Sequence, residues 1–507
     1  MVFLIKKMGK HFKMIKTEKK SKFKIIVGYP PTISEKGIAL LSQNRQFQWF
    51  SNPTYIFPVI LASTATALKN EGNDVLWIDS IAEKISEQQF FNILKEERPD
   101  LFIFETKTPT IKQHWKIIDR IKNTFPNINV VVVGDHVTAL PLETMKNSKA
   151  DYVLTGGDYD FSALSLVKHL IGREKLSSGI YYRKGKEILN TGKFQLTHNL
   201  DNLPFIDREL TKWRLYEKEY NLIGNPYMYI MSGRDCWWGK CRFCAWTTLY
   251  PKFRVRSVNN VLNEIGSLIE KYNIKEIFDD SGTLCTGKWL QDLCRGIIKR
   301  GYNKKIKYSC NMRFNILKQD DYNLMKKANF RLLKFGLESA NQTTLDKLDK
   351  GIKVEDITKG CEMAKKAGLT VHLTMIVGYP WETKEDALNT FKLAKYLMQS
   401  GKADVLQSTV LIAYPGTPLW KDAKNNNWFR INSDDYDKYD MSHPILKTKN
   451  SSPEEIADIC HKIYKIFLTP KYILARLRNI KSFDDIRFNL RGIGAVLGHL
   501  KDFGKKK

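Results

Sequence analysis

Residues 228–244 of this 507-residue sequence read MYIMSGRDCWWGKCRFC, a short apolar run followed by three closely spaced cysteines. Cys236, Cys241 and Cys244 have the spacing C-x4-C-x2-C directly after a predicted strand at 227–232. Three thiolates in one loop can hold three irons of a [4Fe–4S] cube and leave the fourth iron open to another ligand. A closed zinc site would need a fourth Cys or His ligand, and none stands nearby in the sequence. The loop therefore predicts an iron–sulfur cluster, and a zinc site completed from elsewhere in the fold is the alternative.

Strand and helix patterns alternate after the cysteine loop. Apolar strand candidates lie at 227–232, 275–279, 305–310, 332–337, 371–377 and 405–412, with helical patterns at 259–271, 287–300, 319–328, 342–349, 354–367 and 383–399. Six such β/α units predict a (β/α)6 partial TIM barrel at 226–420, with its active site at the C-terminal ends of the strands.

A second alternating series precedes the loop. Strand candidates lie at 23–28, 74–79, 101–104, 129–134 and 151–154, with helical patterns at 55–70, 86–97 and 110–123. This α/β pattern predicts an N-terminal doubly wound parallel sheet at 23–170 that binds ligands at its C-terminal strand ends. The predicted organisation is completed by a basic leader at 1–22, a linker region at 171–225 and a C-terminal helical extension at 421–507.

The three cysteines and a series of strand-end motifs make the chain resemble the radical S-adenosylmethionine (SAM) superfamily. The usual family spacing is C-x3-C-x2-C, one residue shorter than here, and the aromatic residue before the last cysteine matches the family pattern. Further motifs, in family order, are Asp279-Asp280, Cys310 to Arg313, Phe335 to Ser339, Met375 to Pro380 and Ala413 to Pro418. The resemblance implies SAM contacts at Phe243, Asp280, Arg313, Glu338, Ser339, Gly378 and Pro380. It also implies that a reduced cluster cleaves SAM to a 5′-deoxyadenosyl radical, which takes hydrogen from a substrate.

The N-terminal series resembles the cobalamin-binding domain of the B12-dependent class of these enzymes. The resemblance is carried by Tyr55–Asn70, Gly72–Asp79 and Val133–Pro141. It implies cobalamin contacts at Thr106, Thr108, Gly134, Thr138, Gly156 and Gly157. Ile81 stands where the D-x-H-x-x-G signature has its cobalt-ligating histidine, so that loop supplies no histidine ligand. Cobalamin bound without this ligand and a vestigial site both remain open.

The family resemblance implies cobalamin-dependent C-methylation, with radical cyclisation or another non-methylating outcome as alternatives. The segments Tyr436–Tyr439 and Thr469–Tyr472 resemble the bacteriochlorophyll-cyclase and the hopanoid- and lipid-modifying groups, so the expected substrate is a hydrophobic lipid, isoprenoid or tetrapyrrole. A low-potential electron donor such as ferredoxin or flavodoxin is the expected protein partner. A second tight cysteine triplet, typical of methylthiolating enzymes, is not found among the eight cysteines.

The formal net charge of +28 is concentrated at the two ends of the chain. Residues 1–24 contain nine Lys and one Glu, and residues 470–507 contain ten Lys or Arg and three Asp. Such ends can hold a protein to an anionic membrane surface, or they can be solvated tails. Because no signal peptide or apolar run of transmembrane length is found, we expect a cytoplasmic protein with peripheral membrane contact. Charge alone favours a zinc-stabilised nucleic-acid-binding protein as the alternative class, but no nucleic-acid-binding module is recognisable, so nucleic acid is not expected as a partner.

Overall fold

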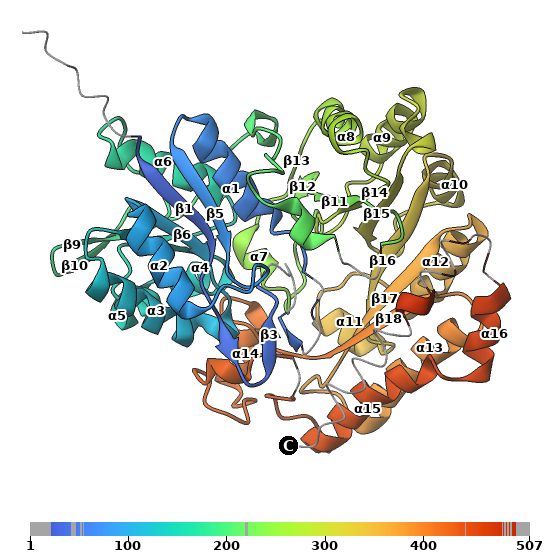
Figure 1. The fold of residues 1–507 in the computed structure, drawn as a ribbon. Helices are drawn as coiled ribbons and strands as arrows, with labels where there is room; N and C mark the ends of the chain where they lie inside the picture. Colours follow the sequence, from blue (N-terminus) through green and yellow to red (C-terminus); the bar gives the residue numbers. More distant parts are fainter. Residues whose placement is uncertain are drawn as a thin grey trace, which may run out of the picture.

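The computed structural model describes residues 22–41, 47–50, 53, 55–217, 222–441, 443–478, 480, 483, 486 and 489–492. Two sheets lie side by side in it, one from the N-terminal part of the chain and one from the middle (Figure 1). Apart from Lys22, the predicted basic leader lies outside the described residues, as do residues 493–507.

The N-terminal sheet has seven strands in the order β10-β9-β8-β7-β6-β1-β5. Its five parallel strands are β5 (Asp74–Asp79), β1 (Lys24–Tyr29), β6 (Leu101–Glu105), β7 (Asn129–Val133) and β8 (Tyr152–Leu154). Its helices are α1 (Val59–Asn70), α2 (Glu87–Glu97), α3 (Ile111–Thr124), α5 (Pro141–Asn147) and α6 (Tyr159–Leu170). This arrangement confirms the predicted doubly wound sheet.

Both faces of the N-terminal sheet are buried, which explains its continuous apolar strands. In β1, Ile25 and Val27 join the core formed with α1 and α6, whereas Ile26 joins the core formed with α2 and α3. Side chains of a strand alternate between its two faces. One unbroken apolar run therefore supplies two separate cores.

The N-terminal sheet does not end at the predicted boundary of 170. The strands β9 (Ile180–Lys184) and β10 (Glu187–Asn190) form an antiparallel hairpin that extends the sheet beyond β8. The sequence predicts a linker region over 171–225, whereas the structure places residues 180–190 of it in the N-terminal sheet. Gly185 and Lys186 form the short connection between the two strands of the hairpin. The sequence pattern on either side of them predicts no strand.

The second sheet confirms the predicted partial barrel. Its six parallel strands follow chain order: β11 (Tyr227–Ile230), β14 (Glu276–Asp279), β15 (Lys307–Met312), β16 (Phe330–Glu338), β17 (Thr370–Val377) and β18 (Val405–Val410). The helices between them are α8 (Val258–Tyr272), α9 (Lys288–Lys299), α10 (Gln319–Lys327), α11 (Gln342–Lys347), α12 (Val354–Lys366) and α13 (Lys384–Gln399). The strand-end loops of this sheet are therefore the expected place for a site.

The C-terminal extension is only partly helical. The helix α14 (Pro418–Asn425) ends the last barrel unit, and α15 (Pro453–Ile466) packs against α13, β17 and β18 before α16 (Pro470–Arg478). Between α14 and α15, residues 426–452 contain no described helix except the 3-10 turn η5 (Tyr436–Lys438), so the helices of the predicted extension lie on either side of an irregular segment. The turn η5 contacts α3 and the 3-10 turn η1 (Thr108–Thr110) of the N-terminal sheet. Within the described part of the chain, no helix is long and apolar enough to cross a membrane.

Short elements connect these layers. They are β2 (Ile33–Ser34), β3 (Gly37–Ala39), β4 (Trp49–Phe50), α4 (Asp135–Ala139), η2 (Leu200–Asn202), η3 (Trp213–Tyr216), β12 (Gly233–Arg234), α7 (Trp246–Leu249), β13 (Arg254–Val255) and η4 (Tyr302–Lys304). The helices α4 and α7 contact one another, which joins the strand ends of the N-terminal sheet to the cysteine loop of the barrel.

Candidate functional site

The three cysteines of the loop after β11 line one cavity at the C-terminal end of the barrel. The cavity has a volume of about 1560 Å³, including its open mouth. Residues from β14, β15, β16, β17 and β18 complete its wall. The cavity therefore extends from the cysteine loop into the lumen of the barrel.

The cysteine loop has a donor set suited to an iron–sulfur cube. Within the described residues, no group of three or more His, Cys, Asp or Glu side chains is arranged to hold a metal ion. A zinc ion needs its ligands around a single point, whereas three thiolates of a cube bind three different irons. Cys236, Cys241 and Cys244 line one cavity, and three thiolates from one loop are the donor set that a cube with one open iron requires.

The surroundings of Cys241 influence its ionisation. Burial raises the pKa of the Cys241 thiol, and the nearby Lys350 and Arg313 act in the opposite direction. Metal ligation requires the thiolate form. The two cations therefore favour the form of Cys241 that binds iron.

A buried ion pair stands beside the cysteine loop. The Lys350 ammonium donates to Glu338 Oε1 at 2.6 Å, and the Arg313 guanidinium donates to the Lys350 carbonyl. Glu338, at the end of β16, has a positive φ of 59°, which non-glycine residues seldom adopt. A Cβ on Gly336 would stand 2.0 Å from Glu338 Oε1, so glycine leaves the space that this carboxylate occupies. Sequence motifs identified Glu338 and Arg313 but gave no role to Lys350.

The predicted SAM contacts fall into two groups. Phe243, Asp280, Arg313 and Glu338 line the cavity with the cysteines. Ser339, Gly378 and Pro380 are not among the lining residues. The Ser339 hydroxyl donates to Glu382 Oε1 at 2.8 Å, and Gly378, at the end of β17, has a φ of 91° that favours glycine.

A further carboxylate that the motifs did not assign lies in the cysteine loop itself. Asp235 Oδ1 accepts a hydrogen bond from the Gly282 amide at 2.6 Å. A Cβ on Gly282 would be 2.2 Å from Asp235 Oδ2. The glycine after the acidic motif of β14 therefore allows the cysteine loop to dock on that strand end.

Four of the six predicted cobalamin contacts lie together where β6 and β7 end. Thr138 Oγ1 donates to the Gly134 carbonyl at 2.7 Å and accepts from the Gly156 amide at 3.0 Å. The Thr106 hydroxyl is hydrogen-bonded to His114 Nδ1 at 2.7 Å, and the Thr108 hydroxyl is hydrogen-bonded to His136 Nδ1 at 3.2 Å. These residues lie next to one another at the edge of the sheet where doubly wound folds bind their ligands.

Gly156 and Gly157 follow β8 and face protein side chains. A Cβ on Gly156 would stand 2.5 Å from the Phe194 ring, and one on Gly157 would stand 2.0 Å from the Tyr250 ring. The Tyr250 hydroxyl donates to the Gly157 carbonyl at 2.7 Å. The absence of a Cβ on these glycines therefore leaves space for the Phe194 and Tyr250 rings. Tyr250 belongs to the segment that follows the cysteine loop.

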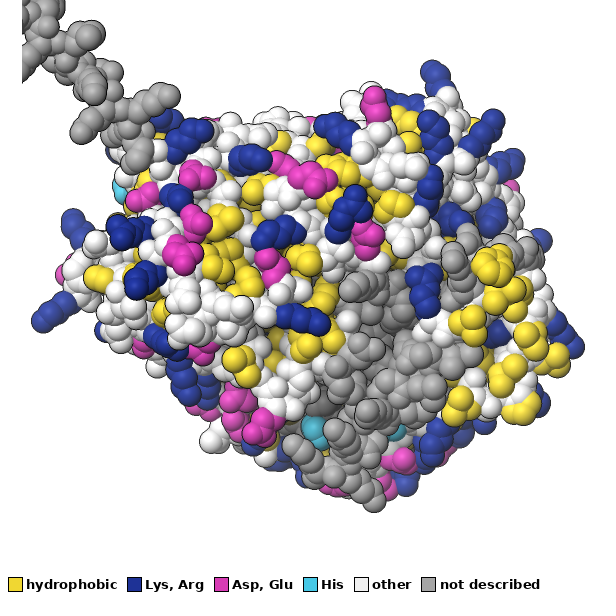
Figure 2. Space-filling model, viewed as in Figure 1, with side chains coloured by type: hydrophobic (Ala, Val, Ile, Leu, Met, Phe, Trp, Pro, Cys, Tyr) yellow, Lys and Arg dark blue, Asp and Glu magenta, His cyan; other side chains and the backbone are white. Residues whose placement is uncertain are grey.

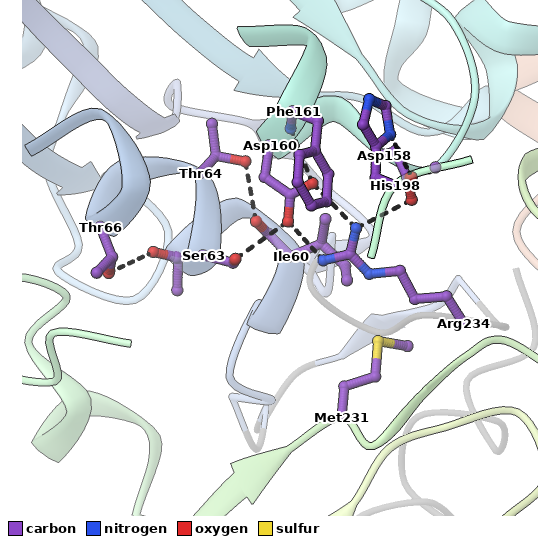
Figure 3. Close-up of polar contacts among 12 residues, drawn as sticks. Ile60, Ser63, Thr64, Thr66, Asp158, Asp160, Phe161, His198, Met231 and Arg234 are labelled. Atoms are coloured by element: carbon purple, nitrogen blue, oxygen red, sulfur yellow. Dashed lines mark hydrogen bonds and ion pairs between the residues drawn. The ribbon is translucent and has the colours of Figure 1, made fainter. Parts of the chain in front are cut away.

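Charged side chains join the two sheets directly at the cysteine loop (Figure 3). Arg234, two residues before Cys236, donates to Asp158 Oδ1 at 3.0 Å and to both Asp160 oxygens at 2.9 and 2.5 Å. Arg254 donates to both Asp158 oxygens at 2.5 and 2.7 Å, and the Ser63 hydroxyl donates to Asp160 at 3.0 Å. We call Arg234, Asp158 and Asp160 the interdomain clamp.

The interdomain clamp is buried, so its charges depend on one another. Arg234 is 4% exposed, Asp158 2% and Asp160 0%. Burial acts to raise the pKa of Asp158, but hydrogen bonds from His198 and Arg254 and the charge of Arg234 lower it below its ordinary value. The Asp158 carboxylate therefore stays ionised, and its ion pair with Arg234 holds the loop that carries the cysteines. Sequence reasoning missed the clamp because its partners lie 76 and 74 residues apart.

Comparison with known proteins gives two family matches, in the order of the two sheets. The model described as the B12 binding domain matches residues 53–165, and that of the radical SAM superfamily matches residues 230–394. Neither is a match to a zinc-stabilised nucleic-acid-binding protein.

Three curated relatives match over most of their length. An uncharacterised methyltransferase of Pyrococcus horikoshii is 30% identical over 423 residues, which is 82% of this chain and 89% of that protein. The anaerobic magnesium-protoporphyrin IX monomethyl ester cyclase of Cereibacter sphaeroides is 24% identical over 424 residues, 82% of this chain and 67% of that protein. The hopanoid C-3 methylase of Methylococcus capsulatus is 24% identical over 406 residues, 78% of this chain and 74% of that protein.

A solved structure has a similar fold over nearly the whole of this chain. It is the cobalamin-dependent S-adenosylmethionine radical enzyme OxsB with aqua-cobalamin bound, with a TM-score of 0.67 over 96% of this chain and 72% of that chain. The sequence identity is 14%, so this likeness concerns the fold.

Proposed function

This chain belongs to the cobalamin-dependent radical SAM enzymes, and from that membership we propose that it methylates an unactivated carbon of a hydrophobic substrate. The cofactors of the family are a [4Fe–4S] cluster, SAM and cobalamin. When bound, they supply the electron that cleaves SAM, the radical that removes a hydrogen atom and the methyl group that replaces it. The residues of the chain hold these groups, orient them and exclude water.

The interdomain clamp is the observation that carries this proposal. It fixes Arg234, two residues before Cys236, to Asp158 and Asp160 at the start of α6, the helix that follows β8. The loop that would hold the cluster is thereby held against the strand-end edge at which doubly wound sheets bind their ligands. Methyl transfer between two cofactors needs this proximity, since reacting groups must be positioned within contact distance.

The apolar wall of the cavity supports a hydrophobic substrate. Ile56, Leu222, Phe278, Leu332, Ile376 and Leu411 are among its lining residues. Apolar walls with a few placed polar groups are typical of small-molecule sites. A low-potential donor such as ferredoxin or flavodoxin would deliver the electrons.

The reaction can be tested with SAM labelled with deuterium in its methyl group. We expect the anaerobically reconstituted and reduced protein, supplied with an apolar cell extract, to form 5′-deoxyadenosine and S-adenosylhomocysteine in similar amounts. A compound of the extract should gain one trideuteromethyl group, measured by mass spectrometry. 5′-Deoxyadenosine without S-adenosylhomocysteine would contradict methylation and favour cyclisation or another radical outcome. Absence of both products would contradict the whole proposal.

We also propose that the protein contacts a membrane surface through α16 and the described residues that follow it, up to Leu490. Among the described residues, eleven large apolar side chains are exposed, and seven of them lie between Leu468 and Leu490. Figure 2 shows apolar side chains gathered over this part of the molecule. Lys471 and Arg478 belong to the same helix, and an amphipathic basic helix of this kind lies in the plane of an anionic membrane.

Vesicle flotation tests the membrane contact. We expect the protein to float with phosphatidylglycerol vesicles at low salt, less with phosphatidylcholine vesicles, and less again at high salt because salt screens the basic residues. A Leu474→Glu, Leu477→Glu double variant should lose at least about half of the bound protein, because it puts charge into the apolar face. Ile33→Glu, at an exposed apolar side chain in the N-terminal part of the chain, is the control and should float normally. No flotation at low salt, or equal losses in both variants, would overturn the proposal.

A further inference from the structure

A histidine without a hydrogen-bond partner lies inside the barrel. His372 on β17 is 1% exposed, and neither of its ring nitrogens has a hydrogen-bond partner among the described residues. It lines the same cavity as the three cysteines. A buried polar group left unpaired destabilises a fold, so this ring is expected to meet a ligand there.

Strand geometry places His372 deep in the lumen. Lys334 on β16 is its direct neighbour in the β16–β17 ladder, and both side chains line the cavity. Lys334 lies four positions before Glu338, the last residue of the strand, which corresponds to about 13 Å along the barrel. The pair therefore forms a polar floor far below the cysteine loop.

Charge is distributed unevenly along the cavity. The acidic side chains that line it, Asp235, Asp280 and Glu338, all belong to the cysteine loop or to the strand ends. The floor instead carries Lys334 and His372. Burial, with Lys334 and Arg331 nearby, lowers the pKa of His372 well below its ordinary value, while Arg331 itself is paired with Glu276 at 2.7 Å. A neutral imidazole beside an ammonium group offers a hydrogen-bond donor next to a positive charge, which suits an anionic oxygen.

We propose that Lys334 and His372 bind a carboxylate at the far end of the substrate, whose apolar body reaches up the lumen toward the cysteine loop. This inference rests on the proposed function, because it takes the lumen as the substrate site. The substrate would then be an elongated apolar molecule with a carboxylate about 13 Å from the cysteine-loop end of the cavity. Between the two ends, Leu332 and Phe278 supply apolar contacts.

Decanoate is the probe for the carboxylate site, because it combines an apolar chain of suitable length with one carboxylate. Its binding is measured by anaerobic titration calorimetry on the reconstituted protein with SAM and an oxidised cluster, a state in which no SAM is consumed. We expect decanoate to bind at least about tenfold more tightly than decan-1-ol, since charge-assisted hydrogen bonds are stronger than neutral ones. Lys334→Met and His372→Phe should each weaken decanoate binding by about tenfold and leave decan-1-ol binding within about twofold.

Controls separate the site from general effects of substitution. His169→Phe, which replaces a histidine outside the cavity, should bind decanoate normally. If His372→Phe does not fold, Lys334→Met still tests the site, because Lys334 is only partly buried. Equal binding of acid and alcohol, or unchanged decanoate binding in Lys334→Met, would overturn the inference. Absence of SAM cleavage by the unmodified, reduced protein would instead overturn the proposed function. Failure of the carboxylate site and failure of the proposed function are therefore distinguishable.

Discussion

Replacing Cys236, Cys241 or Cys244 by alanine is expected to abolish the cluster spectrum and to lower reductive SAM cleavage by at least about 10³-fold, or about 4 kcal/mol in activation free energy. Each thiolate holds a different iron, and the loop has no spare thiol to replace it. The measurements are iron and sulfide content, the absorption and electron paramagnetic resonance spectra of the anaerobic protein, and 5′-deoxyadenosine formation.

Cys285→Ala is the matched control for the cluster variants. Cys285 is a free, partly buried cysteine and the next one along the chain after the loop. It does not line the cavity. The cluster assignment predicts normal iron content and normal SAM cleavage for Cys285→Ala. Retention of cleavage after loss of any loop cysteine, or loss of one bound zinc in Cys285→Ala, would contradict the assignment.

The two parallel sheets were predictable because their strands are buried on both faces. Such strands appear as short apolar runs, and the helices between them show their own period. The β9–β10 hairpin was not predictable in this way, because it lies at the edge of the sheet and most of its residues are only partly buried. Its strands therefore lack the apolar run that identified β7, where four of five residues are buried.

The candidate site was predictable where a motif lies in one continuous stretch. The cysteine loop and the end of β16 are such stretches, and Phe243 and Glu338 line the cavity as expected. Ser339 belongs to the same motif, yet its hydroxyl donates to Glu382 Oε1 and it does not line the cavity. Contacts made by residues distant in the sequence, such as Lys334 with His372 across two strands, require the three-dimensional fold.

Replacing Arg234 of the interdomain clamp by methionine should lower the free energy of unfolding by about 3–5 kcal/mol, because the substitution leaves a buried carboxylate without its ion-pair partner. Among the described residues, Asp160 would keep the Ser63 hydroxyl and its local backbone contact, whereas Asp158 would keep Arg254 and His198. Urea unfolding measured by circular dichroism gives the stability. Since the loop before Cys236 would lose its anchor, the reconstituted cluster should also be lost faster in air, which its absorption reports.

A double-variant experiment separates loss of the ion pair from loss of packing. Asp160→Asn removes the unpaired charge, so the Arg234→Met, Asp160→Asn double variant should recover at least about 1.5 kcal/mol of unfolding free energy relative to Arg234→Met alone.

Arg254→Met is the comparison for a more exposed partner of the same network. Its guanidinium side chain is 11% exposed against 5% for Arg234, and its loss leaves Asp158 bonded to Arg234. It should therefore cost less stability than Arg234→Met and leave the rate of cluster loss near that of the unmodified protein. Equal costs for the two arginines, with no recovery in the double variant, would show that the clamp does not hold the cysteine loop through its charges.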